Sequence, residues 1–291
     1  MNAELLLIFT LDRDRAYLYA HPERELTDDE AVRYEAALSE RARGVPAQYI
    51  TGHQEFWGMD LIVSPAVLIP RPETEHVVET VLELHAPAVS GHFATNEGLA
   101  SEKLATNDRS QPALSERSKP KGLTTRIIDV GTGSGAIALA LAKELPDAEI
   151  HATDISDDAL EIARANAARH ALEKRIRFHH ADLLEGIASG FDLVVSNPPY
   201  VGESEEDAVQ FEVRKFEPRH AVFAGPTGTE VIARLIPQAS AALVPGGWLV
   251  MEISGTIAEE TKSLLRDWEE VSFVPDLQSI PRVVKARKSR R

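Results

Sequence analysis

Residues 126–144 read RIIDVGTGSGAIALALAKE, and this stretch decides the class of fold. A short β-prone run, Ile127 to Val130, leads into glycine at positions 131, 133 and 135 and then into an apolar run typical of a buried helix. Glycines at a strand-to-helix turn let a ligand approach the backbone closely. Their alternate spacing differs from the G-x-G-x-x-G of dinucleotide sites and favours a smaller nucleoside ligand. The alternative explanation is that these glycines only form a tight strand-to-helix corner and bind no ligand.

Strand-type and helix-type runs alternate downstream of this stretch. The β-type runs are 127–130, 150–153, 176–178 and 193–195, and the helical runs are 134–144 and 157–170. A further helix and strand end at Ile253, and a helix over 259–268 precedes β-type runs at 271–274 and 282–285. This alternation predicts an α/β fold, a parallel sheet with helices on both faces.

The residues before this region follow a different pattern. Helices are predicted over 2–20 and 28–43, the second opened by a capping box of Thr27 and Glu30. A small hairpin around Gly58 follows, and then a helix from Pro72 to His85 that would link two domains. Residues 87–122 keep no helix or strand period and are interpreted as a flexible insertion. The expected units are 1–52 (helical docking domain), 53–86 (hairpin and linker helix), 87–122 (insertion) and 123–291 (catalytic domain).

Composition narrows the class of protein. The 291 residues are 43% hydrophobic and 26% charged, as in globular proteins, with a formal net charge of −15. Such a surface repels phosphate backbones, which argues against a broad nucleic-acid interface, and a basic run from Arg282 to Arg291 is typical of a solvated tail. The absence of cysteine excludes disulfides and thiolate zinc sites but leaves the redox compartment undetermined. With no signal-like start and no apolar run of about 20 residues, we expect a cytoplasmic protein with no membrane partner.

Polar residues follow two further predicted strands at the ligand-binding edge of the sheet. Asp154 ends Ala152-Thr153-Asp154 and can accept both hydroxyls of a ribose, and Asp182 with Leu183 offers a polar and an apolar side chain for an adenine ring. Each aspartate alone also suits a helix cap or a loop. The adjacent pair His179-His180 lies in a strand with one ring on each side, which does not favour joint metal binding, and no metal site is predicted.

The tetrapeptide Asn197-Pro198-Pro199-Tyr200 follows the fourth strand. Each proline fixes its own φ and biases the preceding residue towards extended backbone, so this segment is rigid. It can aim the Asn197 side-chain oxygen and the Pro198 carbonyl at the two hydrogens of an NH2 group, with Tyr200 packing beside them. This arrangement suits methylation of an amide or aromatic amine nitrogen, whose delocalised lone pair needs orientation more than it needs a base.

At these residues the chain resembles the class I, S-adenosylmethionine-dependent methyltransferases, and specifically the family that N5-methylates the glutamine of the Gly-Gly-Gln loop in peptide-chain release factors. The resemblance covers nearly the whole chain and is also carried by 48–52, 55–58, 68–75 and 216–218. It implies a seven-stranded Rossmann-like sheet with a small N-terminal helical domain and a connecting β-hairpin. The residues that the resemblance implies to bind S-adenosylmethionine are Gly131, Thr132, Gly133, Ser134, Gly135, Asp154, Leu183 and Asn197. Asp182 is added to this predicted site because of its position after the strand.

The resemblance further implies that residues 197–200 hold the substrate glutamine and that the N-terminal helices dock the release factor. A monomer without direct nucleic-acid contact is expected. The chain departs from the family pattern in a later start of the first helix, in the long 87–122 segment, and in Ser254 where glycine is usual. Three alternatives stay open: an adenine-N6 nucleic-acid methyltransferase that flips its base, a ribosomal-protein glutamine methyltransferase, and a non-catalytic nucleotide-binding module.

Overall fold

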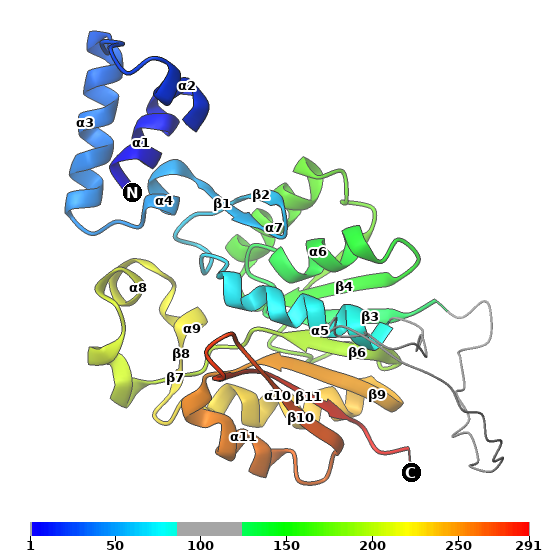
Figure 1. Ribbon diagram of the computed structural model, residues 1–291. Coiled ribbons are helices and arrows are strands. Elements are labelled where there is room, and N and C mark those ends of the chain that lie inside the picture. Colours follow the sequence, from blue (N-terminus) through cyan, green and yellow to red (C-terminus); the bar gives the residue numbers. More distant parts are fainter. Residues whose placement is uncertain (1, 86–123, 291) are drawn as a thin grey trace, which may run out of the picture.

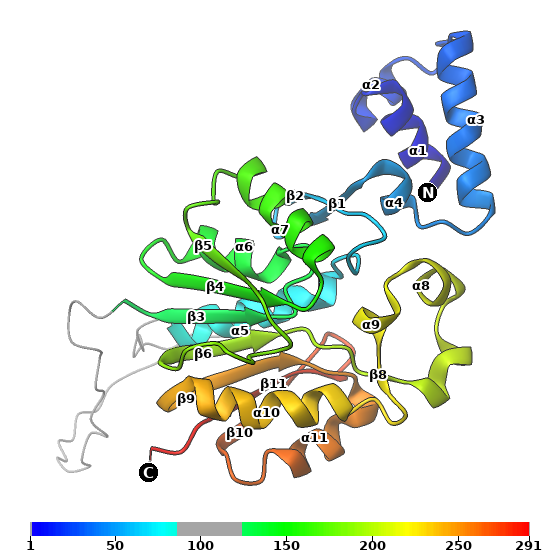
Figure 2. The same ribbon diagram turned by 180° about the vertical axis from the view of Figure 1, so that it is seen from behind.

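The computed structural model describes residues 2–85 and 124–290, so the predicted insertion at 87–122 lies outside the described residues. Its centre is a seven-stranded sheet in the order β10-β11-β9-β6-β3-β4-β5. Five strands are parallel, whereas β11 is antiparallel to both β9 and β10. The predicted α/β fold is therefore confirmed, with an antiparallel pair added at one edge of the parallel sheet (Figures 1 and 2).

The strands of this sheet agree closely with the β-type runs of the sequence. In chain order they are β3 (Arg126–Val130), β4 (Glu149–Asp154), β5 (Ile176–His180), β6 (Phe191–Ser196), β9 (Leu243–Glu252), β10 (Glu269–Pro275) and β11 (Pro281–Arg287). After β3, β4 and β5 the chain returns to the other side of β3 to form β6. The carboxyl ends of β3 and β6 therefore flank the point where open α/β sheets bind ligands.

Helices cover both faces of the sheet. One core cluster joins α5 (Glu75–His85) and α6 (Ala136–Glu144) to side chains of β3, β4 and β6. A second cluster packs α10 (Glu230–Ala242) on the opposite face, where α11 (Ala258–Leu264) lies beside it. The predicted linker helix is thus a layer of the sheet domain, because α5 contributes Val77, Val78 and Val81 to the first core cluster.

The N-terminal helices differ from the prediction in one respect. The single helix expected over 2–20 is two helices, α1 (Asn2–Leu11) and α2 (Arg15–Ala20). The break has a local cause, because Asp12 adopts φ 50° and the Asp14 side chain accepts a hydrogen bond from the Tyr17 backbone, which caps a new helix. The next helix, α3 (Asp28–Ala42), carries the predicted Thr27–Glu30 capping box, and α4 (Ala47–Thr51) follows it.

A hairpin of β1 (His53–Phe56) and β2 (Met59–Ile62) joins these helices to the sheet domain, as predicted. Its anchor is Asn166 of α7 (Asp157–Arg169), which has no exposed surface. The Asn166 side chain accepts from Ile62 N at 2.7 Å and donates to Ile62 O at 3.0 Å and to Ser134 O at 2.9 Å. One buried amide therefore fixes the hairpin against the glycine turn.

The segment after Tyr200 holds short elements that the sequence pattern did not reveal. They are β7 (Val201–Gly202), η2 (Glu203–Ala208), α8 (Phe211–Phe216), α9 (Arg219–Val222) and β8 (Phe223–Gly225). Two 3-10 helices, η1 (Pro72–Thr74) and η3 (Gly255–Ile257), precede α5 and α11. The helix expected over 259–268 ends earlier, at Leu264, because the chain turns there into β10.

Candidate active site

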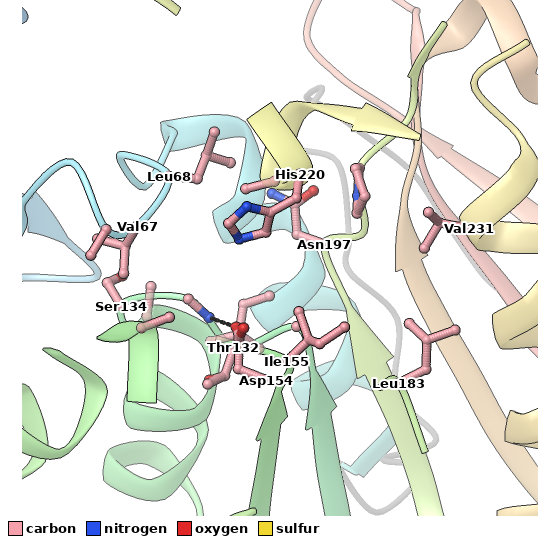
Figure 3. Close-up of a pocket in the computed structure, with 18 of the residues that line it drawn as sticks. Val67, Leu68, Thr132, Ser134, Asp154, Ile155, Leu183, Asn197, His220 and Val231 are labelled. Atoms are coloured by element: carbon pink, nitrogen blue, oxygen red, sulfur yellow. Dashed lines mark hydrogen bonds between the residues drawn. The ribbon is translucent and has the colours of Figure 1, made fainter. Parts of the chain in front are cut away.

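A cavity of about 320 Å³ lies at the carboxyl ends of β3, β4 and β6 (Figure 3). Eight of the residues singled out for binding line it together: Gly131, Thr132, Gly133, Ser134, Asp154, Asp182, Leu183 and Asn197. Pro199 lines it as well, whereas Gly135, Pro198 and Tyr200 are not among the lining residues. The structure thus brings most of the separate sequence signals into one concave site, where ligands bind in most proteins.

The glycine turn presents bare backbone to this cavity. Gly131 and Gly133 adopt φ 69° and 55°, and a Cβ added to either would meet no heavy atom within 4 Å. These two glycines therefore leave space that side chains would occupy, beside a cavity that a nucleoside could enter. Gly135 has a different role, because a Cβ there would press on Leu139 and Ala163, which indicates helix packing.

Asp154 is held in place by backbone amides on both sides. Its Oδ2 accepts from Gly133 N at 2.8 Å and its Oδ1 accepts from Ser156 N at 2.9 Å. The residue is only 8% exposed, yet it lines the cavity. Each carboxylate oxygen keeps a second lone pair, so Asp154 can still accept hydroxyl groups from a ligand.

A second carboxyl group, Asp129, contacts the glycine turn through Thr132. It ends up fully buried near the end of β3, and its Oδ2 accepts from Thr132 Oγ1 at 2.6 Å. Burial raises the pKa of Asp129 to about 7, because desolvation outweighs the Thr132 hydrogen bond. Two buried carboxyl groups therefore lie beside the glycine turn, and of these Asp154 lines the cavity.

Asp182 and Leu183 follow β5 at the same edge. Asp182 accepts a hydrogen bond from Arg234 Nη2 at 2.6 Å, which fixes its carboxylate at the rim. Leu183 is half-buried with φ 55°, a left-handed conformation that is rare for a branched side chain. Ile155 also lines the cavity with 54% of its surface exposed, and sequence analysis did not single it out.

Asn197 reaches the cavity from the end of β6. The strand is tied to its neighbour there, since Ser196 Oγ donates to Val130 O at 2.7 Å. The Asn197 side-chain nitrogen donates to Thr74 Oγ1 at 3.0 Å, and Thr74 is buried at the end of η1. With its nitrogen engaged, Asn197 keeps its oxygen as a free acceptor.

Tyr200 turns away from the cavity, and its ring packs against the core formed by α10. Its hydroxyl donates to Glu252 Oε1 at 3.0 Å, and Glu252 ends β9 with 2% of its surface exposed. Burial raises the pKa of both groups. Tyr200 therefore packs in the core next to the site and contacts Glu252, whereas Asn197 lines the cavity.

Sequence analysis missed Thr74, Glu252 and His220 as site residues. Thr74 lies within the 68–75 motif, which carried the family resemblance without assigning a role to its hydroxyl. His220 lines the cavity from α9 and, in the view of Figure 3, its ring lies between Asn197 and Thr132. No local pattern marks this histidine, because tertiary folding alone brings α9 over the cavity.

Two of the segments that carry the family resemblance, 68–75 and 216–218, contact each other beside the cavity. Arg71 forms an ion pair with Glu217, whose side chain is almost fully buried and also accepts from Ile69 N at 3.2 Å. This contact joins segments 146 residues apart. It orders the loop that carries α9 against the segment that carries Thr74.

Neither a metal site nor a membrane helix is found in the part of the chain that the structure describes. No group of three or more His, Cys, Asp or Glu residues there could hold a metal ion. No helix within 2–85 or 124–290 is long and apolar enough to cross a membrane. His179 contacts His151, with 2.9 Å between ring nitrogens, whereas His180 bonds to Ile155 O, so the adjacent rings have separate partners.

Two family models match the chain. The Methyltransferase small domain model matches residues 93–215, and the PrmC N-terminal domain model matches residues 1–52. Curated relatives match along almost the full chain. A "Release factor glutamine methyltransferase" from Koribacter versatilis is 50% identical, over 99% of this chain and 91% of that protein. One of the same name from Chlorobaculum tepidum is 40% identical, over 97% and 88%.

Solved structures share the fold at much lower sequence identity. The hMettl16 catalytic domain in complex with MAT2A 3′UTR hairpin 1 aligns with a TM-score of 0.56 and 16% identity, over 91% of this chain and 82% of that chain. A methyltransferase from Pyrococcus furiosus aligns with a TM-score of 0.50 and 16% identity, over 88% and 98%. These likenesses show a common methyltransferase fold.

Proposed function

This chain belongs to the release factor glutamine methyltransferase family, and from that premise we propose that it methylates the side-chain amide nitrogen, N5, of the glutamine in the Gly-Gly-Gln loop of peptide-chain release factors, with S-adenosylmethionine as methyl donor. The observation that carries this proposal is the orientation of Asn197. Its nitrogen is engaged by Thr74, which leaves an acceptor oxygen at a cavity that also contains the glycine turn and Asp154.

The cavity fits the proposed donor. Gly131 and Gly133 provide the close backbone surface that a Cβ would fill, Asp154 can accept ribose hydroxyls, and Leu183 offers an apolar contact for a base. S-adenosylmethionine, when bound there, supplies a methyl group on a positively charged sulfur. The aspartates around the site suit a cation, because Asp154 and Asp182 both line the cavity.

The remaining residues act on the acceptor nitrogen. We assign to Asn197 Oδ1 and the Pro198 carbonyl the two hydrogens of the glutamine NH2 group, which orients the nitrogen lone pair towards the methyl group. In the reaction the nitrogen–carbon bond forms, the carbon–sulfur bond breaks, and one N–H proton leaves to solvent. Because an amide lone pair is delocalised, catalysis depends on orientation and on acceptors that stabilise charge growing on the N–H groups.

The protein substrate explains the rest of the chain. The N-terminal helices expose Leu5, Phe9, Tyr19 and Val32, large apolar side chains that a partner protein could cover. This distribution supports docking of the release factor on α1 to α3, while its loop enters the cavity. The net charge of −15 supports a protein substrate over a nucleic acid.

The test is to incubate the purified chain with a release factor and isotopically labelled S-adenosylmethionine. We expect mass spectrometry to find a single added methyl group on the glutamine of the loop peptide. A release factor with asparagine in place of that glutamine serves as the control and should stay unmodified. If the loop peptide stays unmodified while RNA or duplex DNA becomes labelled, the chain acts on adenine and the proposal is wrong.

A further inference from the structure

The Thr74 hydroxyl occupies a position that requires a second partner. It accepts a hydrogen bond from Asn197 Nδ2 at 3.0 Å, and Thr74 is 4% exposed. A hydroxyl that accepts one hydrogen bond still carries a hydrogen of its own, and a buried donor needs an acceptor. The neighbouring groups should therefore include an acceptor for Thr74.

Glu252 supplies the matching acceptor. Its Oε1 accepts from Tyr200, but its Oε2 is buried and has no hydrogen-bond partner within the described ranges 2–85 and 124–290. Burial raises the pKa of Glu252, and the hydroxyls of Thr74 and Tyr200 lower it. The Thr74 hydroxyl therefore acts on the Glu252 carboxyl group.

We propose that Thr74 and Glu252 are positioning residues that control which way the Asn197 amide points. In the proposed chain of hydrogen bonds the Asn197 nitrogen donates to Thr74, the Thr74 hydroxyl turns towards Glu252 Oε2, and Glu252 Oε1 accepts from Tyr200. The inference rests on the proposed function, because it concerns how the amide nitrogen of the substrate is held.

The orientation of the Asn197 amide matters because its oxygen and its NH2 group have nearly the same shape, but the oxygen accepts hydrogen bonds and the NH2 group donates them. If the Asn197 amide rotated by half a turn, its NH2 group would face the NH2 group of the substrate, donor against donor. Thr74 blocks this rotation only if its oxygen is an acceptor, and a carboxylate that takes its hydrogen keeps it so.

The first experiment changes the middle of the chain. Thr74→Val keeps the shape and removes the hydroxyl, and we expect kcat to fall about 10- to 100-fold, as for a reacting group displaced by about 1 Å. The dissociation constant for S-adenosylmethionine, measured by calorimetry, should change little. Thr74→Ser should restore most of the lost kcat.

Thr80→Val is the matched control. Thr80 is also buried, and its hydroxyl donates only to the His76 carbonyl within α5. This variant loses the same hydroxyl from a neighbouring turn and should keep its turnover. If Thr74→Val turns over as fast as Thr80→Val, the proposal is overturned.

The second experiment changes the end of the chain. Glu252→Gln keeps the shape and an acceptor for Tyr200 but presents an NH2 group to Thr74, so kcat should fall about 10-fold. The Thr74→Val/Glu252→Gln double variant should be no slower than the slower single variant, because both break one chain. Effects that multiply would show that the two residues act separately and would overturn the proposal.

A readout without turnover separates this proposal from the proposed function. In the ligand-free protein, the Asn197 side-chain NH2 signals, assigned by their loss in Asn197→Asp, should exchange slowly with solvent and become fast in Thr74→Val. Equal exchange in both proteins contradicts the hydrogen-bond chain. Slow exchange in a wild-type protein that leaves release factors unmethylated would support the chain and refute the proposed function.

Discussion

The candidate site, taken as the cavity and the residues that support it, has two halves that are built in different ways. The cofactor half, defined as Asp129, the glycine turn 131–135, Asp154 and Leu183, comes from one continuous run of strands and helices. The amide half, defined as Thr74, Asn197, Tyr200 and Glu252, joins residues 123 and 52 positions apart through side-chain hydrogen bonds. Backbone geometry forms the first half and tertiary contacts form the second. Substitutions in the cofactor half should therefore affect donor binding, and substitutions in the amide half should affect turnover.

The largest effect is expected from the amide half. Asn197→Ala removes the acceptor that orients the substrate nitrogen, so kcat should fall about 10²- to 10³-fold, as when one preorganised hydrogen-bond partner is lost. Calorimetry should show nearly unchanged affinity for S-adenosylmethionine. A large loss of donor affinity instead would mean that the two halves are not separable in this way.

In the cofactor half, the protonation of Asp129 should make the free energy of unfolding depend on pH. Its pKa of about 7 in the folded protein lies above the unfolded value of 3.8, so the folded state binds the proton more tightly. The stability that this proton contributes is complete below pH 3.8 and is lost as pH rises through 7. Between pH 5 and pH 8 the loss amounts to about 2–3 kcal/mol.

Asp129→Asn removes this titration. The free energy of unfolding of the variant relative to wild type should therefore rise by that amount between pH 5 and pH 8, measured by urea denaturation at each pH. A difference between the two proteins that stays constant across this range would show that Asp129 does not titrate there.

Asp154→Asn should weaken donor binding with less effect on turnover. Losing the charge on an acceptor of two backbone amides should lower the affinity for S-adenosylmethionine about 10- to 100-fold, while kcat at saturating donor stays close to wild type. Asp157→Asn, an exposed change three residues further on, is the control and should bind normally. Unchanged affinity in Asp154→Asn would remove this residue from the cofactor half.

The smallest effect is expected at the contact that supports the amide half. Glu217→Gln weakens the pair with Arg71 and should cost about 1–2 kcal/mol of stability and a few-fold in kcat, with donor affinity unchanged. The control is Glu206→Gln, which changes the same charge at an exposed pair with Arg219 in the same region and should unfold like wild type. Equal behaviour of the two variants would argue against a supporting role for Glu217.

The order of the seven sheet strands and of the longer helices after residue 126 could be predicted because each has a strong local period, and the structure agrees with it within a few residues. The single helix expected over 2–20 was wrong because Asp12 and Asp14 form a turn and a cap inside an otherwise helical pattern. The elements between Tyr200 and Gly225 were missed because none exceeds six residues. Such short helices form only with tertiary support.

Sequence alone determined the parts of the site that depend on backbone. Glycine at 131 and 133 permits a left-handed turn, and two prolines after Asn197 hold it extended, both properties of the residues themselves. Only the tertiary structure decided that Thr74, Glu252 and His220 belong with them. A buried hydroxyl or carboxyl group must find its hydrogen-bond partner in space, and a partner more than fifty residues away leaves no periodic trace in the chain.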